Sequence, residues 1–255
     1  MTSNFRIKIF GDGADKEAIA KLNQNPLIAG FTTNPTLMRK AGVVDYKHFA
    51  LEVLSIVKDK PISFEVLSDD FVEMESQARE IASWGDNVYV KIPITNTLKE
   101  SSVPLIARLA ALGVKLNVTA IMTIQQIEAV IPALRAASSA YVSVFAGRIA
   151  DAGIDPEPTM RKALELMKEY PHIELLWASP REVFNVVQAD KLGCHIITAT
   201  DDVLKKLSSI GKDLEQFSLE TVKMFYDDAV AAGYQIKAQT DFAPPAVQPV
   251  VMSPN

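Results

Sequence analysis

Apolar and polar residues alternate along several short segments of the chain, and the apolar positions share one parity. These positions are Ile62, Phe64 and Val66; Val88, Val90 and Ile92; Leu116, Val118 and Ala120; and Val142, Val144 and Ala146. Neighbouring side chains of a strand point to opposite faces, so this alternation predicts strands with one apolar face. The opposite parity carries the polar residues Glu65, Lys91, Asn117, Thr119 and Ser143.

Strand-like segments alternate with helical ones over most of the chain. The candidate strands are Arg6–Gly11, Leu27–Thr32, Ile62–Leu67, Val88–Ile92, Val114–Ala120, Tyr141–Ala146, Ile173–Ala178 and Cys194–Ala199. Helical periodicity marks Asp70–Trp84, Thr123–Ala137 and Glu157–Tyr170 between them, and Leu219–Ala232 after them. This order predicts an α/β fold, a single-domain (β/α)8 TIM barrel over residues 1–241. A doubly wound sheet stays open as an alternative, because spacing alone cannot close a barrel. The proline-rich, nearly uncharged residues 242–255 predict an extended or disordered tail.

A barrel would give the polar parity a definite location. Its outward face must be apolar to meet the helices, so the five polar side chains would point inward, toward the carboxyl ends of the strands where barrel enzymes build their sites. One buried polar residue is common, but five in four successive strands must satisfy one another or bind something. We therefore predict a functional site there.

Lys91 lies within the apolar run Val88–Ile94, which is an unfavourable place for an ammonium group. Burial favours the neutral form of an amine, and a neutral amine can attack a carbonyl carbon to form a Schiff base. The alternative is a structural lysine paired with a nearby carboxylate.

Two further candidates lie at the ends of the first two strands. Asp12 closes the first strand, where its carboxylate could act as a general acid or base, although Gly11–Asp15 could also be a simple turn with Asp15 capping the next helix. Asn34 precedes Pro35, and this pair could serve only to start a helix.

Arg148, Ser179 and Arg181 follow the sixth and seventh strands. Two guanidinium groups and a hydroxyl near adjacent barrel ends suit a phosphate, because each arginine offers forked donors. The alternative is a set of surface salt bridges to Asp151 or Glu182.

Composition narrows the classes of function. The chain has 255 residues and a net charge of −5, with a pI near 5.3, which argues against a general nucleic-acid or anionic-membrane surface. No run reaches the length of a membrane span and the first residues lack a secretory signal, so we expect a soluble, cytoplasmic protein. The single cysteine, Cys194, excludes an internal disulfide and is expected to be a small buried strand residue rather than a catalytic thiol.

Five motifs occur in the order found in the transaldolases, and the chain resembles that family from about Arg6 to Val222, specifically the short subfamily related to fructose-6-phosphate aldolase. The motifs are Thr32-Thr33-Asn34-Pro35, Val90-Lys91-Ile92-Pro93, Asn117-Val118-Thr119, Phe145-Ala146-Gly147-Arg148 and Ala178-Ser179-Pro180-Arg181. Five motifs in register make the resemblance specific.

The resemblance implies a role for each motif residue. Lys91 would be the Schiff-base nucleophile and Asp12 the general acid and base, while Glu65 and Thr119 would hold a water that relays protons. Asn34, with Thr33 beside it, Asn117 and Ser143 would bind substrate hydroxyl groups or the covalent intermediate. Arg148, Ser179 and Arg181 would bind the sugar phosphate. The implied chemistry needs no metal or organic cofactor, and His48, His172 and His195 are too widely spaced in sequence to suggest a metal site.

Transfer and simple aldol cleavage differ only in how the enamine intermediate is resolved. Glu65 and Phe145 resemble the transaldolase choices, whereas the related aldolase has glutamine and tyrosine there, so we expect a transferase acting on ketose and aldose phosphates. A tyrosine hydroxyl could help to protonate the enamine, which phenylalanine cannot do. Gly13 and Pro180 depart from the commoner pattern of the motifs and leave acceptor specificity open.

Two other expectations complete the hypothesis. A barrel that has lost catalysis and only binds sugar phosphates is the alternative from another class, and the presence of Lys91, Asp12 and Glu65 argues against it. The subfamily commonly forms rings of five or ten subunits and longer transaldolases tend to be dimers, so the resemblance implies a homo-oligomer.

Overall fold

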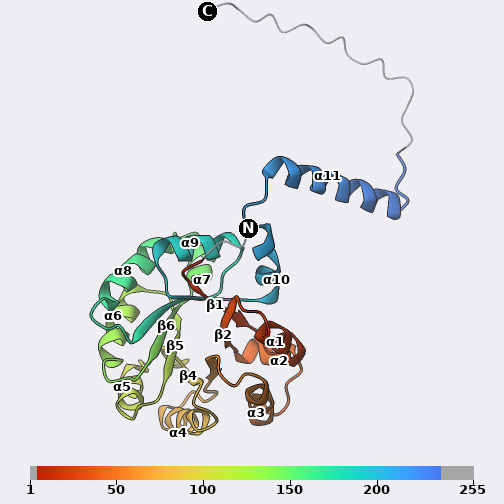
Figure 1. The fold of residues 1–255 in the computed structure, drawn as a ribbon. Helices are drawn as coiled ribbons and strands as arrows, with labels where there is room; N and C mark the ends of the chain where they lie inside the picture. Colours follow the sequence, from red (N-terminus) through yellow and green to blue (C-terminus); the bar gives the residue numbers. More distant parts are fainter. Residues whose placement is uncertain (1–4, 237–255) are drawn as a thin grey trace, which may run out of the picture. The chain divides into compact units, whose positions relative to one another are not determined.

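Eight parallel strands close into a barrel in the computed structural model, which describes residues 5–236 (Figure 1). The strands are β1 (Lys8–Asp12), β2 (Ile28–Thr32), β3 (Ile62–Glu65), β4 (Val88–Pro93), β5 (Leu116–Ile121), β6 (Ala140–Val144), β7 (Ile173–Trp177) and β8 (Ile196–Ala199). Each strand pairs with the next, and β8 pairs with β1. The expected TIM barrel is therefore confirmed, and this last pairing excludes a doubly wound sheet.

Helices surround the strands of the barrel (Figure 1). They are α1 (Lys16–Asn23), α2 (Pro35–Lys40), α3 (Tyr46–Ile56), α4 (Phe71–Ala82), α5 (Val103–Ala111), α6 (Ile124–Ala133), α7 (Ala146–Asp151), α8 (Glu157–Met167), α9 (Phe184–Leu192) and α10 (Asp201–Leu204), followed by the 3-10 helix η1 (Lys205–Ser209). Side-chain caps begin several of them: Thr123 forms a capping box with Gln126 at α6, and Asp70 accepts from the first-turn backbone of α4. The expected helices within the barrel are confirmed, with shorter ends.

The main hydrophobic core lies between the strands and the helices. Every residue expected to face the helix layer belongs to it except Ala120. Ala120 has a φ of +62° and lies in a register shift, where Val118 pairs with Val142 but Ile121 pairs with Val144. This β-bulge inserts one residue into β5, so that Ile121 takes the outward position expected for Ala120. In β5, the alternation inferred from the sequence is correct as far as Thr119 and wrong at Ala120.

A second, smaller cluster of buried residues fills the barrel interior. Its members include Phe10, Tyr89, Tyr141, Leu176 and Ile196. The rings of Tyr89 and Tyr141 stack with centroids 4.0 Å apart, and Phe10 meets Tyr141 edge-on. The three rings lie two residues before the polar side chains Asp12, Lys91 and Ser143 on β1, β4 and β6. They therefore form an aromatic layer beneath the polar residues, which we call the aromatic floor.

Cys194 is buried as expected, but it precedes β8 instead of belonging to it. Burial raises the pKa of its thiol to about 12, so at neutral pH the group is a protonated, unreactive core side chain.

Ile210 and Gly211 mark the boundary between two compact units, the second of which contains helix α11 (Leu214–Ala231). The expected C-terminal helix is confirmed and begins five residues earlier than predicted, where Asp213 accepts a hydrogen bond from the Gln216 amide at 2.9 Å. The expected limit of the barrel domain at residue 241 and the tail at residues 242–255 lie outside the described residues. Within residues 5–236, no helix combines the length and apolarity needed to cross a bilayer.

Candidate active site

Lys91 lies inside the barrel on β4, in register with Glu65 on β3 and Asn117 on β5. Only 6% of the residue is exposed. Its Nζ atom is 3.0 Å from Oε2 of Glu65 and donates to the backbone carbonyl of Thr33 at 2.8 Å. A buried amine thus has a carboxylate within reach for proton exchange. The carboxylate partner weighed as a structural alternative is present, so geometry alone permits both interpretations.

Asp12 ends β1, and its Oδ1 atom accepts a hydrogen bond from Oγ1 of Thr32 at 2.8 Å. Burial raises the pKa of this carboxyl above its usual range, and the nearby carboxylate of Glu65 adds to the rise. The positive charge of Lys91 and the Thr32 hydrogen bond oppose the increase. Asp12 also borders a cavity of about 460 Å³ between β1, α1, α2 and the start of α10. A carboxyl with a raised pKa beside a cavity is suited to proton transfer.

Asn117 and Ser143 are joined in a buried hydrogen-bond network. The Ser143 hydroxyl donates to Oδ1 of Asn117 at 2.6 Å, and Nδ2 of Asn117 donates to the Ser63 hydroxyl at 3.0 Å. Sequence analysis missed Ser63, although its parity in β3 matches that of Glu65 and pointed to the same inward face. Thr119 is the next inward position after Asn117 and is 2% exposed. Four of the five expected inward residues are therefore joined in two pairs, each across adjacent strands: Lys91 with Glu65, and Ser143 with Asn117.

Thr33 and Asn34 both take part in local structure. The Thr33 hydroxyl is fully buried and donates to the Ser63 carbonyl at 2.8 Å, so its backbone carbonyl is the group that meets Lys91. Oδ1 of Asn34 accepts from the Leu37 amide at 3.0 Å and caps α2, with Pro35 at the first turn. The capping role considered for Asn34 is confirmed, and within residues 5–236 its Nδ2 group donates no hydrogen bond.

The segments Phe145–Arg148 and Ala178–Arg181 lie against each other at the carboxyl ends of β6 and β7. A Cβ atom placed on Gly147 would lie 1.5 Å from the backbone oxygen of Ser179, so only glycine fits there. Ser179 itself has a φ of +61°, which is strained for a residue with a side chain. Phe145 is half-buried and packs against the inner cluster. Two motifs distant in sequence thus form one surface.

The two arginines of this surface differ in their partners. Arg181 forms a forked ion pair with Asp151, in which Nε donates to Oδ1 at 3.0 Å and a terminal nitrogen contacts Oδ2. This is the salt bridge considered as the alternative to phosphate binding. Arg148 is exposed on α7, and among the described residues its side chain makes no ion pair. Arg148 is therefore the freer of the two cations.

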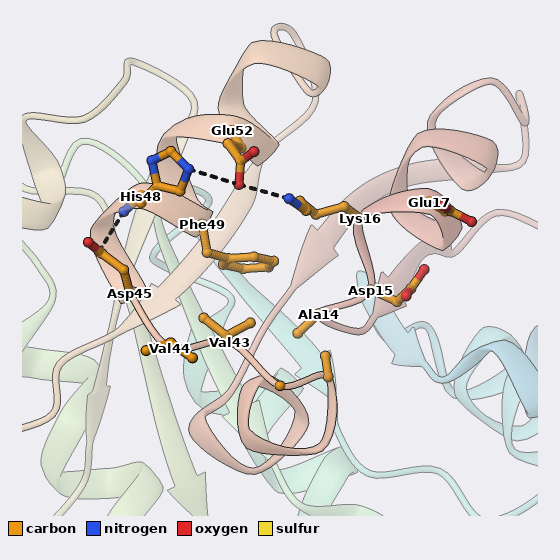
Figure 2. Close-up of a pocket in the computed structure, with 12 residues that line it drawn as sticks. Ala14, Asp15, Lys16, Glu17, Val43, Val44, Asp45, His48, Phe49 and Glu52 are labelled. Atoms are coloured by element: carbon orange, nitrogen blue, oxygen red, sulfur yellow. Dashed lines mark hydrogen bonds and ion pairs between the residues drawn. The ribbon is translucent and has the colours of Figure 1, made fainter.

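A cavity of about 500 Å³ lies between α1 and α3 (Figure 2). Glu52 connects its walls, with Oε2 2.9 Å from Nζ of Lys16 and 3.5 Å from Nε2 of His48. None of the residues expected to form the site lines this cavity. Within residues 5–236 as a whole, no three His, Cys, Asp or Glu side chains are grouped so as to hold a metal ion.

The fold and the inward polar cluster define a (β/α)8 barrel with its polar groups at the carboxyl ends of the strands, which is the arrangement used by barrel enzymes. The family model described as "Transaldolase/Fructose-6-phosphate aldolase" matches residues 9–243. The chain belongs to this family, and it is an enzyme of the transaldolase and aldolase type.

Similar curated proteins agree with the family assignment. A "Probable transaldolase" of Dehalococcoides mccartyi is 36% identical over 202 residues, which cover 79% of this chain and 90% of that protein. Another of Nitrosopumilus maritimus is 34% identical over 235 residues, covering 91% of this chain and 100% of that protein.

Solved structures with low identity share the fold alone. A 3-hexulose-6-phosphate synthase matches with a TM-score of 0.53 at 16% identity, over 76% of this chain and 89% of that one. The dihydrodipicolinate synthase of Rhodopseudomonas palustris matches with a TM-score of 0.52 at 13% identity, over 89% of this chain and 80% of that one.

Proposed function

We propose that the protein is a transaldolase that moves a dihydroxyacetone unit from a ketose phosphate to an aldose phosphate through a Schiff base on Lys91. The donor is fructose 6-phosphate or sedoheptulose 7-phosphate. The observation that carries this proposal is the buried Lys91 amine, 3.0 Å from the carboxylate of Glu65. A lysine kept for stability alone would be better placed at the surface, because burying its charge is costly even when it is paired.

The first half of the reaction forms and cleaves the covalent adduct. Neutral Lys91 attacks the C2 carbonyl carbon of the ketose, and loss of water gives an iminium ion. Glu65 exchanges the protons of these steps with the amine and the departing oxygen, through a water held with Thr119. Asp12 then removes the C4 hydroxyl proton as the C3–C4 bond breaks, and the bonding electrons move into the iminium to give an enamine. An aldose phosphate leaves.

The second half reverses these steps with another aldehyde. The enamine carbon attacks the carbonyl of the acceptor, and Asp12 returns its proton to the new hydroxyl group. Water then adds to the iminium, and the new ketose phosphate is released with Lys91 restored. The raised pKa of Asp12 supports this role, because the group must both accept and release a proton.

The remaining motif residues bind the substrate in this proposal. Asn34, Asn117 and Ser143 hold the hydroxyl groups of the three-carbon unit, and the carbonyl of Thr33 helps to orient Lys91. Arg148 and Ser179 bind the phosphate together with the donors of Arg181 that Asp151 leaves free. Phe145 lies beside the reacting carbons and supplies no proton to the enamine.

A lyase of the fructose-6-phosphate aldolase type is the second candidate, because it shares every step up to the enamine. Phe145 favours transfer, since it has no hydroxyl with which to protonate the enamine. Without that proton, the enamine persists until an acceptor aldehyde arrives.

The test of this function measures glyceraldehyde 3-phosphate release from fructose 6-phosphate with a coupled dehydrogenase, with and without erythrose 4-phosphate. Sustained release only with the acceptor is expected. Equal release without it would identify a lyase. No release in either case would indicate another sugar or a barrel that only binds sugar phosphates.

A second experiment identifies the nucleophile. Borohydride reduction in the presence of fructose 6-phosphate should leave the reduced three-carbon unit on the protein after glyceraldehyde 3-phosphate has departed, and peptide mapping should place this unit on Lys91. Lys91→Met should lose both the adduct and turnover, while Lys168→Met, which alters an exposed lysine after α8, should keep both. An adduct on another lysine would overturn the assignment.

We also expect a homo-oligomer, with a pentamer or decamer favoured over a dimer. Light scattering coupled to gel filtration measures its mass directly. A monomer at micromolar concentration would contradict this expectation.

A further inference from the structure

Two threonine hydroxyl groups form a short chain that ends on Asp12. Thr32 on β2 is in register with Asp12, and Thr198 on β8 is in register with Phe10, so the two threonines lie on opposite sides of β1. Oγ1 of Thr32 is 2.8 Å from Oδ1 of Asp12 and 2.5 Å from Oγ1 of Thr198. The two threonines are only 3% and 5% exposed. Neither threonine has a role in the function described above.

The protons of this chain can be assigned by counting donors. A hydroxyl group has one proton, and an ionised carboxylate can only accept. The Thr32 hydroxyl therefore donates its hydrogen bond to Asp12 when Asp12 is ionised. The contact between the threonines must then be donated by Thr198. Ionised Asp12 thus fixes the direction of both hydrogen bonds, from Thr198 to Thr32 to Asp12.

The position of Thr198 makes a purely structural role a weak explanation. Its neighbour on the same inward face, Ile196, belongs to the apolar inner cluster, where valine would fill the same volume as threonine. Among the described residues, the only hydrogen bond of the Thr198 hydroxyl is the one to Thr32. The hydroxyl group therefore acts on Asp12 through Thr32 or has no polar function.

We propose that Thr198 is a positioning residue, whose hydroxyl orients that of Thr32 so that Oδ1 of Asp12 is held and Oδ2 is left to exchange protons with the substrate. This inference rests on the proposed function, because it assumes that Asp12 transfers the proton of the C4 hydroxyl.

The linked hydroxyl groups of Thr198 and Thr32 also affect the proton affinity of Asp12. A hydrogen bond to the ionised form favours that form, and Thr32 opposes the rise that burial causes in the pKa of Asp12. A weaker chain should raise this pKa further and move the acidic limb of activity to higher pH. Other ionisable groups also face Asp12 and remain unchanged in the test: Glu65 on β3 and Lys91 on β4, with Lys40, Asp15, Asp201 and Asp202 around the cavity.

The test compares Thr198→Ala with Thr198→Ser, which both lack the threonine methyl group and differ from each other only in the hydroxyl. Thr198→Ala should lower kcat about tenfold, the effect of one ordered hydrogen bond, with little change in KM. The acidic limb of kcat/KM should move to higher pH. Thr198→Ser should retain most of the activity and the original pH profile, and Thr198→Val should behave like Thr198→Ala.

Borohydride trapping separates this inference from the proposed function. All three variants should still form the reduced adduct on Lys91, because within residues 5–236 its amine is held by Thr33 and Glu65 and not by Thr32 or Thr198. Equal kcat and equal pH profiles for Thr198→Ala and Thr198→Ser would overturn the positioning role. Failure of the unaltered protein to be trapped would instead overturn the Schiff-base function. Thr159→Val on α8 controls for the loss of a threonine hydroxyl elsewhere in the barrel.

Discussion

Nζ of Lys91 and Oε2 of Glu65 lie 3.0 Å apart on adjacent strands, with only 8% and 18% of the two side chains exposed. The cost of removing two charges from water offsets most of their attraction, so a buried ion pair is weak evidence of stabilisation. The pair therefore adds little net stability to the barrel. Its energetic contribution can be tested separately from its chemistry.

Removing one member of this pair should cost more stability than removing both. Lys91→Met leaves the Glu65 carboxylate without its cation and should lower the free energy of unfolding by about 3 kcal/mol. The double variant Lys91→Met/Glu65→Gln should recover most of that loss, because no unpaired buried charge remains. Urea unfolding of the single and double variants measures both values. An equal or larger loss in the double variant would show that the unpaired Glu65 carboxylate is not what destabilises Lys91→Met.

Asp12 should reduce stability at neutral pH. Burial raises its pKa above the ordinary value of 3.8, so the folded state binds this proton more tightly than the unfolded state. Stability must then fall as the pH rises from 3.8 through the raised value. Asp12→Asn removes this penalty and should unfold at higher urea at pH 7, with a gain of about 1 kcal/mol.

That gain should shrink as the pH falls through the raised value toward 3.8, and it should vanish below 3.8, where the unaltered carboxyl becomes protonated in both states. Asp86→Asn, which changes an exposed aspartate, should show no comparable pH dependence. A gain independent of pH would mean that ionisation of Asp12 is not its cause.

Arg148 should contribute to affinity for phosphorylated sugars. Arg148→Ala should raise KM for fructose 6-phosphate about tenfold or more, because a charged hydrogen bond to phosphate is lost. Turnover of non-phosphorylated fructose should stay unchanged. Arg135→Ala, which removes another exposed arginine, is the matched control. Equal losses for both sugars would exclude phosphate recognition by Arg148.

Gly147 should tolerate no side chain. Gly147→Ala places a methyl group against the backbone oxygen of Ser179 and should cost about 3 kcal/mol of stability through overpacking. Gly13→Ala should be far less harmful, because no atom lies within 4 Å of its added Cβ. Thermal unfolding of the two variants decides the comparison, and equal melting temperatures would contradict it.

The sequence predicted the barrel because strand alternation depends on local residue types. Lys91, Glu65, Asn117 and Ser143 were placed on one face by parity alone, and they contact one another or nearby backbone in the folded chain. Parity gives the wrong face where a β-bulge inserts an extra residue into a strand. The bulge at Ala120 lies among residues that favour a regular strand, and no glycine marks it.

Pairings between distant residues were beyond the sequence argument. Asp151 and Glu182 were both considered as salt-bridge partners of the arginines, and only the packing of α7 against the loop after β7 brings Asp151 to Arg181. The link from Thr198 through Thr32 to Asp12 needs closure of β8 onto β1, which no local pattern encodes. Ser63 could have been found by extending the parity of Glu65 by two residues.

The aromatic floor of Phe10, Tyr89 and Tyr141 leaves the barrel with one entrance. A substrate cannot pass through the packed interior, so in the proposed transfer reaction both aldehydes use the same entrance, one after the other. In that reaction the first aldehyde leaves before the second binds, and the two compete for the enzyme that carries the three-carbon enamine. Parallel lines in double-reciprocal plots would be the kinetic signature of this shared entrance.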